Sequence, residues 1–161
     1  MTQYKKVLES KMKIRFHDCD PYNHLNNSRY IDYIITARGD QLIDYYGFNM
    51  YELLRQEGIG WVTAHTEISY FAPAMLMEEV TIQTQLIHCS EKSLHLEGIM
   101  WNGDKTQIKA ILWARLVHFN IRAQKSQQHS KEFMQFFLQV VNPLPASQLF
   151  ADRIKSLKQY V

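Results

Sequence analysis

Residues 15–30 read RFHDCDPYNHLNNSRY, a dense run of reactive side chains. The run holds two carboxylates, two imidazoles and three carboxamides. The residues from Lys11 to Phe16 favour a strand, and from Ser28 onward apolar residues recur at helical spacing. Pro21 and the asparagines between them favour a loop. Because loops between regular elements often carry binding or catalytic groups, we expect the functional site here.

The start of the helix that follows this loop can interact with negative charge. A helix start exposes backbone N–H groups without partners and carries a partial positive charge. Asp20 lies just upstream, so we expect an acidic group beside the N–H groups near Asn27 and Ser28. Such an arrangement suits the polarisation of a carbonyl or the stabilisation of an oxyanion. Asn26, Asn27 and Ser28 are also what any helix start favours, so a capping role is expected for them in any case.

The loop resembles the motif of a known family. The residues that carry the resemblance are Asp18-Cys19-Asp20-Pro21, then His24-Leu25-Asn26-Asn27, then Tyr30. They resemble the D-x-D-x-x-G-H-x-N-N loop of hotdog-fold thioesterases of the 4-hydroxybenzoyl-CoA thioesterase group, except that Asn23 stands where the family usually has Gly. The resemblance implies an α+β hotdog fold, an antiparallel sheet wrapped around a long central helix. We assign residues 1–121 to this domain and expect 122–161 to form a C-terminal helical extension packed on it.

The resemblance also implies an activity, the hydrolysis of an acyl-CoA thioester to free acid and CoA. In the family, the residue that matches Asp20 is the catalytic carboxylate, which acts as nucleophile or as general base. His24 and Asn27 would position water or substrate, and the helix start near Asn27 would polarise the carbonyl. No cofactor is implied.

The implied substrate is an acyl-CoA or acyl-carrier-protein thioester, and the sequence leaves open both the carrier and the acyl group. The expected substrate-binding residues are Asn26, Tyr30 and Lys92. Family members place basic residues on the nucleotide at a turn like that of Lys92, whose ordinary interpretation is a solvated lysine. The family's active site lies between two subunits, which implies a homodimer or homotetramer in which His65 or Glu67 of a partner strand could face the catalytic loop.

Other interpretations of the loop residues stay open at this level. An aspartate in a loop most often caps a turn or a helix, and a lone histidine is more often structural than catalytic. The side chains that could bind zinc or iron are His17, Asp18, Asp20 and His24, but their spacing matches no metal motif, so we predict no metal site. Cys19 and His24 would pair a thiol with a base, although no third, orienting group is evident.

Two other functions are compatible with a hotdog scaffold. A noncatalytic acyl-CoA or acyl-carrier binding module would keep an apolar tunnel but lack a properly placed carboxylate, so Asp20 separates it from an enzyme. A hotdog dehydratase usually carries its acid within the long helix, near a histidine of the partner. Here the acid precedes the helix, which argues against that alternative.

Length and composition narrow the class of protein. A chain of 161 residues most simply forms one domain, which can bury roughly 70% of its unfolded surface. The net charge of +2 gives no reason to expect nucleic acid. Neither a signal peptide nor a membrane span is evident, and Cys19 and Cys89 are too few for a disulfide framework. We therefore expect a soluble, cytoplasmic protein with free thiols and no membrane partner.

Hydrophobic spacing predicts the remaining elements. The long helix runs from Ser28 to Tyr46 and ends at Gly47, a residue suited to the left-handed position after a helix. The elements expected after it are a helical turn at 50–56, strands at 60–70, 80–86, 94–101 and 106–120, and helices at 131–141 and 151–160. Strict alternation would place Trp61 and Ile68 on opposite faces of one strand.

The last expected strand, 106–120, is apolar on both faces. Alternation groups Ile108 with Ala110 and places Ile111 on the other face. A sheet that is buried on both sides needs cover on both sides. The long helix can supply one cover, and a second subunit or the C-terminal helix can supply the other.

Overall fold

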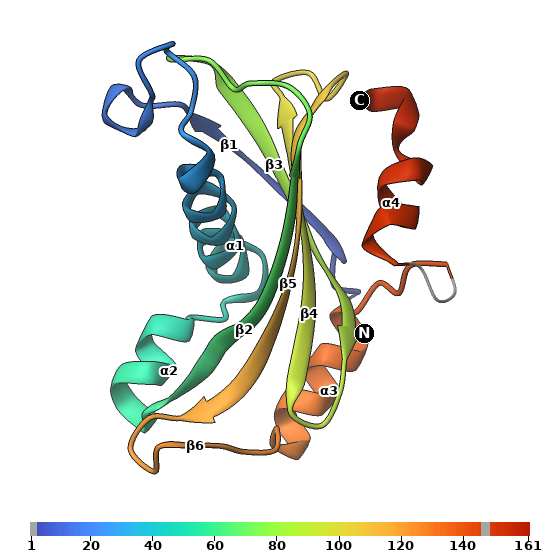
Figure 1. Ribbon diagram of the computed structural model, residues 1–161. Coiled ribbons are helices and arrows are strands. Elements are labelled where there is room, and N and C mark those ends of the chain that lie inside the picture. The colour runs from blue at the N-terminus through green and yellow to red at the C-terminus, as the bar shows by residue number, and fades with distance from the viewer. Residues whose placement is uncertain (1–2, 146–148) are drawn as a thin grey trace.

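A computed structural model describes residues 3–145 and 149–161 as one curved antiparallel sheet with helices packed on it (Figure 1). The strands are β1 (Val7–Lys13), β2 (Ile59–Tyr70), β3 (Glu79–Cys89), β4 (Ser93–Asn102), β5 (Ile108–Asn120) and β6 (Lys125–Ser126). The helices are α1 (Tyr30–Tyr46), α2 (Met50–Glu57), α3 (Lys131–Val140) and α4 (Phe150–Ser156). The strand order is β1-β3-β4-β5-β2, and β6 pairs with β5. This architecture confirms the α+β hotdog fold.

The long helix α1 packs on one face of the sheet along a single apolar stripe. Tyr30, Ile34 and Ala37 lie in one buried cluster with strand residues that include Ala110 and Leu112. The contact is close at Gly98 in β4, where a Cβ atom would lie 2.3 Å from Cγ2 of Ile34. A glycine at this position therefore lets the helix approach the sheet.

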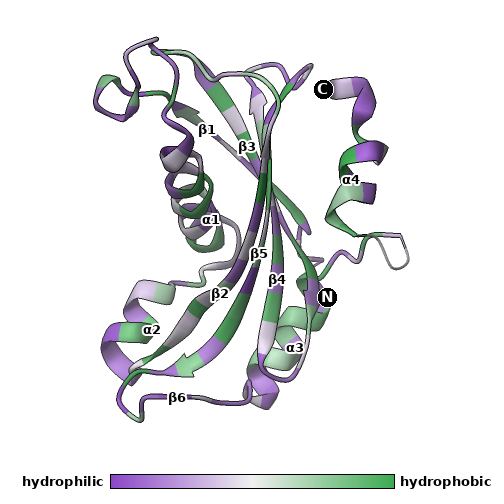
Figure 2. Ribbon diagram, viewed as in Figure 1, coloured by the Kyte–Doolittle hydropathy of each residue, from purple (hydrophilic) through white to green (hydrophobic). Residues whose placement is uncertain are grey.

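The opposite face of the sheet is covered by α4 (Figure 1). Phe150 and Ile154 of α4 pack against a cluster that contains Trp101 and Ile111, and Figure 2 shows hydrophobic positions along β4, β5 and α4. The C-terminal helix thus covers the second apolar face. The division of the chain at residue 121 stays a prediction.

A buried ion pair fixes α4 to the sheet. Arg153 places Nε 2.8 Å and Nη2 2.9 Å from the two carboxylate oxygens of Glu97. Glu97 is only 1% exposed and also accepts hydrogen bonds from Gln85 and Trp113. If α4 docked elsewhere, the buried Glu97 carboxylate would lose the Arg153 cation, which is strongly unfavourable. This ion pair therefore specifies where α4 docks.

Two register irregularities make the predicted alternation wrong. The pairing of β2 with β5 shifts between Thr63 and His65, and this extra residue turns Trp61 toward α1, the face that Ile68 also contacts. A second shift in the β4–β5 pairing places Ile108 in the cluster of Ile111. Trp61 and Ile108 were therefore assigned to the wrong faces by the sequence pattern.

Helix boundaries differ little from the expected ones. A 3-10 turn at Asn27–Arg29 precedes α1, which therefore begins at Tyr30 rather than Ser28. The helix ends as predicted at Gly47, which has φ of 65°. The last helix stops at Ser156 and is followed by a 3-10 turn over Lys158–Tyr160. Among the described residues, no helix has both the length and the apolar character that a membrane span needs.

Two buried histidines connect the segment before α3 to the sheet. The Nε1–H of Trp61 donates to Nε2 of His129 at 3.0 Å, so this nitrogen is unprotonated and Nδ1–H donates to the Ser90 carbonyl at 2.9 Å. The ring of His118 stacks against both partners, 4.9 Å from the Trp61 ring and 4.9 Å from the His129 ring. Burial lowers the pKa of both histidines. The folded state therefore favours their neutral forms.

We predict that acid destabilises the protein through His118 and His129. In the unfolded chain these side chains take up a proton below about pH 6.5, whereas the folded chain resists protonation, so the free energy of unfolding falls as the pH drops below that value. Urea unfolding at pH 7.5 and pH 5.5 measures the difference. In the variant His118→Asn/His129→Gln the loss between the two pH values should be smaller; an equal loss in both proteins would contradict the assignment.

Candidate active site

The predicted loop forms a tight turn around the side chain of Asp20. Oδ1 of Asp20 accepts hydrogen bonds from the backbone N–H groups of Tyr22, at 2.9 Å, and of His24, at 3.1 Å. The backbone of Asp20 also donates to the His24 carbonyl at 2.8 Å. One carboxylate oxygen is therefore fixed by the loop. Oδ2 has no hydrogen-bond partner among the described residues.

The turn explains the departure from the family motif at Asn23. Asn23 has φ of 61°, in the left-handed region that Gly adopts freely. Asn is the residue that tolerates this region best after Gly. The backbone of the loop can therefore keep its shape with Asn at this position, and the Asn23 side chain is exposed.

An open cleft of about 300 Å³ lies beside this turn. Its walls are Asp20, His24, Leu25, Asn27, Tyr30, Tyr70, Phe71, Ala72 and Pro73. The cleft brings together four of the residues predicted from the sequence, Asp20, His24, Asn27 and Tyr30. They come from the loop, from the 3-10 turn that precedes α1 and from the first residue of α1. Leu25 of the loop, the last residue of β2 and the three residues that follow it form the rest of the wall.

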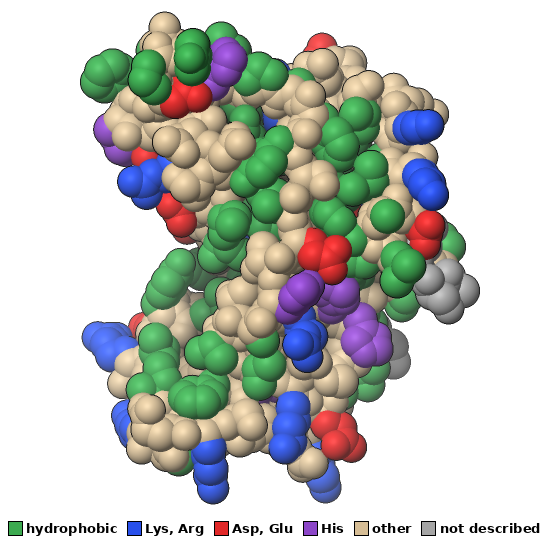
Figure 3. Space-filling model, viewed as in Figure 1, with side chains coloured by type: hydrophobic (Ala, Val, Ile, Leu, Met, Phe, Trp, Pro, Cys, Tyr) green, Lys and Arg blue, Asp and Glu red, His purple; other side chains and the backbone are tan. Residues whose placement is uncertain are grey.

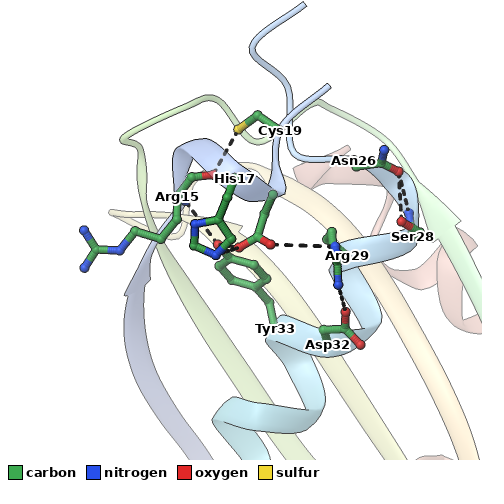
Figure 4. A network of polar contacts seen from close by, with 9 residues as sticks. Arg15, His17, Cys19, Asn26, Ser28, Arg29, Asp32 and Tyr33 are labelled. Carbon is green, nitrogen blue, oxygen red and sulfur yellow. Dashed lines mark hydrogen bonds and ion pairs between the residues drawn. The ribbon is translucent and has the colours of Figure 1, made fainter. Parts of the chain in front are cut away.

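The start of the helical segment is capped as the sequence predicts. The carboxamide oxygen of Asn26 accepts hydrogen bonds from the backbone N–H of Ser28, at 3.1 Å, and from its hydroxyl, at 3.0 Å (Figure 4). Asn26 does not belong to the cleft wall. Its side chain is engaged in the cap, so its expected role in substrate binding has no geometric support in this chain.

Tyr70 connects the helix start to the end of β2. Its hydroxyl donates to the Asn27 carbonyl at 2.8 Å, and its ring meets the edge of Tyr30 at a centroid distance of 5.1 Å. Tyr30 itself is only 2% exposed, and its hydroxyl accepts from the backbone N–H of Ala74 at 3.0 Å. Tyr30 therefore acts as a fixed wall of the cleft. Tyr70 was missed by sequence reasoning, in which it only ended a strand before Ala72 and Pro73.

The neighbouring Asp18 has a different environment, that of a structural carboxylate. The hydroxyl of Tyr33 donates to Asp18 Oδ2 at 2.7 Å, and Arg29 Nε lies 3.7 Å from Oδ1. The backbone N–H of Arg15 donates in turn to the Tyr33 hydroxyl at 3.1 Å. These contacts hold the strand, the loop and α1 together. Asp18 does not line the cleft that Asp20 lines.

The alternative chemistries suggested by the loop are not assembled. Within residues 3–145 and 149–161, no three His, Cys, Asp or Glu side chains are placed to hold a metal ion, so the possible ligand set around His17 and His24 does not form. The thiol of Cys19 donates to the Arg15 carbonyl at 3.4 Å. Burial, together with the charges of Asp18 and Asp20, raises the pKa of Cys19, which disfavours the thiolate that a nucleophile needs.

Within one chain Lys92 lies far from the cleft. It occupies the turn between β3 and β4, whereas the other end of β3, at Glu79, pairs with Lys13 beside the loop. A strand of 11 residues, as β3 is, spans roughly 35 Å. Lys92 therefore does not reach the Asp20 cleft of its own chain, and its expected role in substrate binding stays a prediction.

His65 and Glu67 lie on the exposed edge strand β2. Their side chains are hydrogen-bonded, with His65 Nε2 3.1 Å from Glu67 Oε1, and Glu67 pairs across the sheet with Trp113, which contacts α4. They thus lie on the face turned away from α1. Figure 3 shows histidine side chains beside acidic and basic groups in the middle of this view. Within one chain neither residue belongs to the cleft wall.

Comparisons with known proteins identify relatives of this chain. The chain is 27% identical over 119 residues to the long-chain acyl-CoA thioesterase FadM of Escherichia coli, an alignment that covers 74% of this chain and 88% of FadM. The crystal structure of YbaW, a probable thioesterase from Escherichia coli, matches with a TM-score of 0.70 and 26% identity over 84% of this chain and 99% of that one.

A third protein shares the fold at lower identity. It is SAV2348 from Staphylococcus aureus, whose structure was determined in complex with CoA, and it matches with a TM-score of 0.76 and 14% identity over 92% of both chains. The thioesterase-like superfamily matches residues 14–142, most of the chain. The chain belongs to the thioesterase-like superfamily, which confirms the predicted family, its hotdog fold and the enzyme class, a thioester hydrolase.

Proposed function

We propose that this protein hydrolyses acyl-CoA thioesters to a free acid and CoA, with Asp20 as nucleophile or general base. The observation that carries the proposal is the free Oδ2 of Asp20 in a cleft shared with the helix start. The relationship to FadM, which is named a long-chain acyl-CoA thioesterase, supports this class of substrate. The structure of SAV2348 with CoA shows that the same fold accommodates that carrier.

The helix start supplies the group that would polarise the thioester carbonyl. The N–H of Ser28 is occupied by the Asn26 cap, whereas the N–H of Asn27 has no partner among the hydrogen bonds of the described residues. Asn27 lines the cleft with Asp20. One such donor, aimed at the oxygen where negative charge develops, contributes about 3 kcal/mol to transition-state stabilisation.

The two backbone hydrogen bonds to Oδ1 set the direction of the Asp20 carboxylate. With one oxygen held, Oδ2 is free to attack the carbonyl carbon, giving a mixed anhydride, or to take a proton from an attacking water. The leaving group is a thiolate, and the parent thiol has a pKa of only about 8.5. The reaction therefore needs no dedicated general acid, and His24 in the cleft wall would position water or substrate.

The sheet has an unpaired edge that suits a second copy of the chain. Strand β2 is 12 residues long and stands at the end of the strand order, and its central residues Val62 to His65 are exposed. A long exposed edge presents free N–H and C=O groups to another strand. Antiparallel pairing of β2 with its copy would bring the Gly60 end of the partner beside Tyr70 and the cleft, so we propose a homodimer in which the partner completes the site.

The dehydratase alternative receives no support from α1. The acidic residues of this helix are Asp32, Asp40 and Asp44, and all three are exposed. The buried face of α1 has none. A noncatalytic binding module stays the other candidate function, and it differs from an enzyme in the role of Asp20.

We predict that Asp20→Asn lowers the hydrolysis rate at least about a hundredfold, the low end of what general-base catalysis contributes. The amide oxygen can still accept from Tyr22 and His24, so folding and acyl-CoA binding should survive. Thiol release from a series of acyl-CoA chain lengths measures the rate. The matched control is Asp18→Asn, which should reduce the rate much less; a wild-type rate in Asp20→Asn would favour a noncatalytic module or another active site.

We predict that hydrolysis is insensitive to chelators, because the proposed chemistry uses one carboxylate and backbone dipoles. The rate before and after treatment with EDTA, followed by gel filtration, should be the same. Loss of activity that zinc or iron restores would instead assign the histidines and aspartates of the loop to a metal site.

We predict that the protein is at least dimeric at micromolar concentration, as measured by light scattering. The variant Val62→Lys places a charge on the exposed edge of β2 and should shift the mass toward the monomer. Leu138→Lys, at an exposed apolar residue of α3, is the matched control and should leave the mass unchanged. A monomer mass for the wild-type protein would contradict the proposal that two subunits share the site.

A further inference from the structure

A second cavity lies at the other end of α1, between this helix, the sheet, α2 and α3. Its volume is about 50 Å³. The side chains that define it are Arg38, Leu42, Phe48, Trp61, Leu86 and Phe137. All of these are apolar except Arg38. The cavity is thus an apolar space with one cationic wall.

Arg38 is buried without a counter-ion. It is only 9% exposed, and its hydrogen bond to another side chain runs from Nη1 to the Thr84 hydroxyl at 3.1 Å. Among the described residues, no Asp or Glu forms an ion pair with it. Burial lowers the pKa of Arg38 to about 10, and the opposing charge effect comes from Tyr46, not from a carboxylate.

Arg38 is a wall residue of the cavity, and most of its donors have no partner among the described residues. A guanidinium carries five N–H donors, and Thr84 accepts one of them. Among the described residues, two side-chain polar atoms are inaccessible to solvent and lack a hydrogen-bond partner, Trp101 Nε1 and His118 Nε2. The nitrogens of Arg38 are not among these, so those that lack a hydrogen-bond partner keep some accessible surface. A buried cation that lacks a partner is strongly unfavourable, which makes a bound anion the natural complement of this wall.

We propose that this cavity binds a small monocarboxylate, with the carboxylate on Arg38 and the alkyl group against the apolar side chains. A planar guanidinium pairs with a carboxylate through two parallel hydrogen bonds. Since one water needs roughly 10–15 Å³, the volume of about 50 Å³ holds about three to five water-sized groups, the size of acetate or propionate. An alcohol lacks the charge, and a halide lacks the apolar group.

This cavity is separate from the Asp20 cleft. The two share no wall residue. Arg38 follows Tyr30 by two turns of α1, a rise of about 12 Å. The carboxylate site therefore does not rest on the proposed thioesterase function, and it is tested by binding rather than by activity.

The experiment titrates the full chain with sodium acetate, propionate, butyrate and hexanoate in a calorimeter and measures the melting temperature with each, at constant ionic strength. Propionate should bind and raise the melting temperature, and hexanoate should bind more weakly because it exceeds the cavity. Sodium chloride and 1-propanol should have no comparable effect. Absence of binding by every carboxylate, or an equal response to chloride or 1-propanol, would overturn the proposal.

Variants of the chain separate the contribution of the Arg38 charge to binding from that of the cavity. Arg38→Met keeps the length of the side chain and replaces a buried charge with an apolar group, a change that folded proteins tolerate; it should weaken propionate binding at least about tenfold. Arg55→Met removes an exposed cation from α2 and is the matched control, in which propionate binding should be unchanged. Leu116 also lines the cavity, so Leu116→Phe fills this space while it keeps Arg38, and it should also abolish binding. Undiminished binding by Arg38→Met and Leu116→Phe would place the carboxylate elsewhere and contradict the assignment.

Discussion

The close contact of Ile34 with Gly98 fixes the distance between the long helix and the sheet, and the positions of both cavities depend on it. Because Gly98 has no Cβ, the Ile34 side chain reaches the backbone of β4 near the middle of the sheet. Above this contact the start of the helical segment meets the end of β2 through Tyr70, where the Asp20 cleft lies. Below it Arg38 lines the apolar cavity. One packed contact thus separates two chemically different spaces along one helix.

Two aspartates of the same loop are held by different kinds of interaction. Asp18 is held by side chains, through the Tyr33 hydroxyl and Arg29, which connect it to α1. Asp20 is held by backbone N–H groups of its own turn, which leave one of its oxygens free. The two carboxylates are separated by one residue, yet one stabilises the loop and the other faces the cleft. Rigid support next to an unsatisfied group is what a reactive carboxylate requires.

Local patterns predicted the parts of the fold that depend on neighbouring residues. The loop motif, the helix that ends at Gly47 and the four successive strands follow from spacing and turn chemistry, and the structure confirms them. The register shifts in β2 and β5 were not predictable, because Ala and Thr fit either face of a strand and leave no trace in the alternation. Tyr70 contacts a carbonyl 43 residues earlier, and such long-range partners are invisible in a single sequence. An arginine within a helix is expected at the surface, so the burial of Arg38 could not be anticipated either.

The most direct test of the account is the position of a bound thioester. A crystal structure of the Asp20→Asn protein with an acyl-CoA would reveal the reacting carbonyl in a slowed enzyme. The account predicts that the carbonyl oxygen lies about 3 Å from the N–H of Asn27. The carbonyl carbon should lie about 3.5 Å from the side chain at position 20 for direct attack, or one water molecule away from it for general-base catalysis. A thioester bound outside the cleft of Asp20, His24 and Tyr70, with the CoA well ordered, would contradict it.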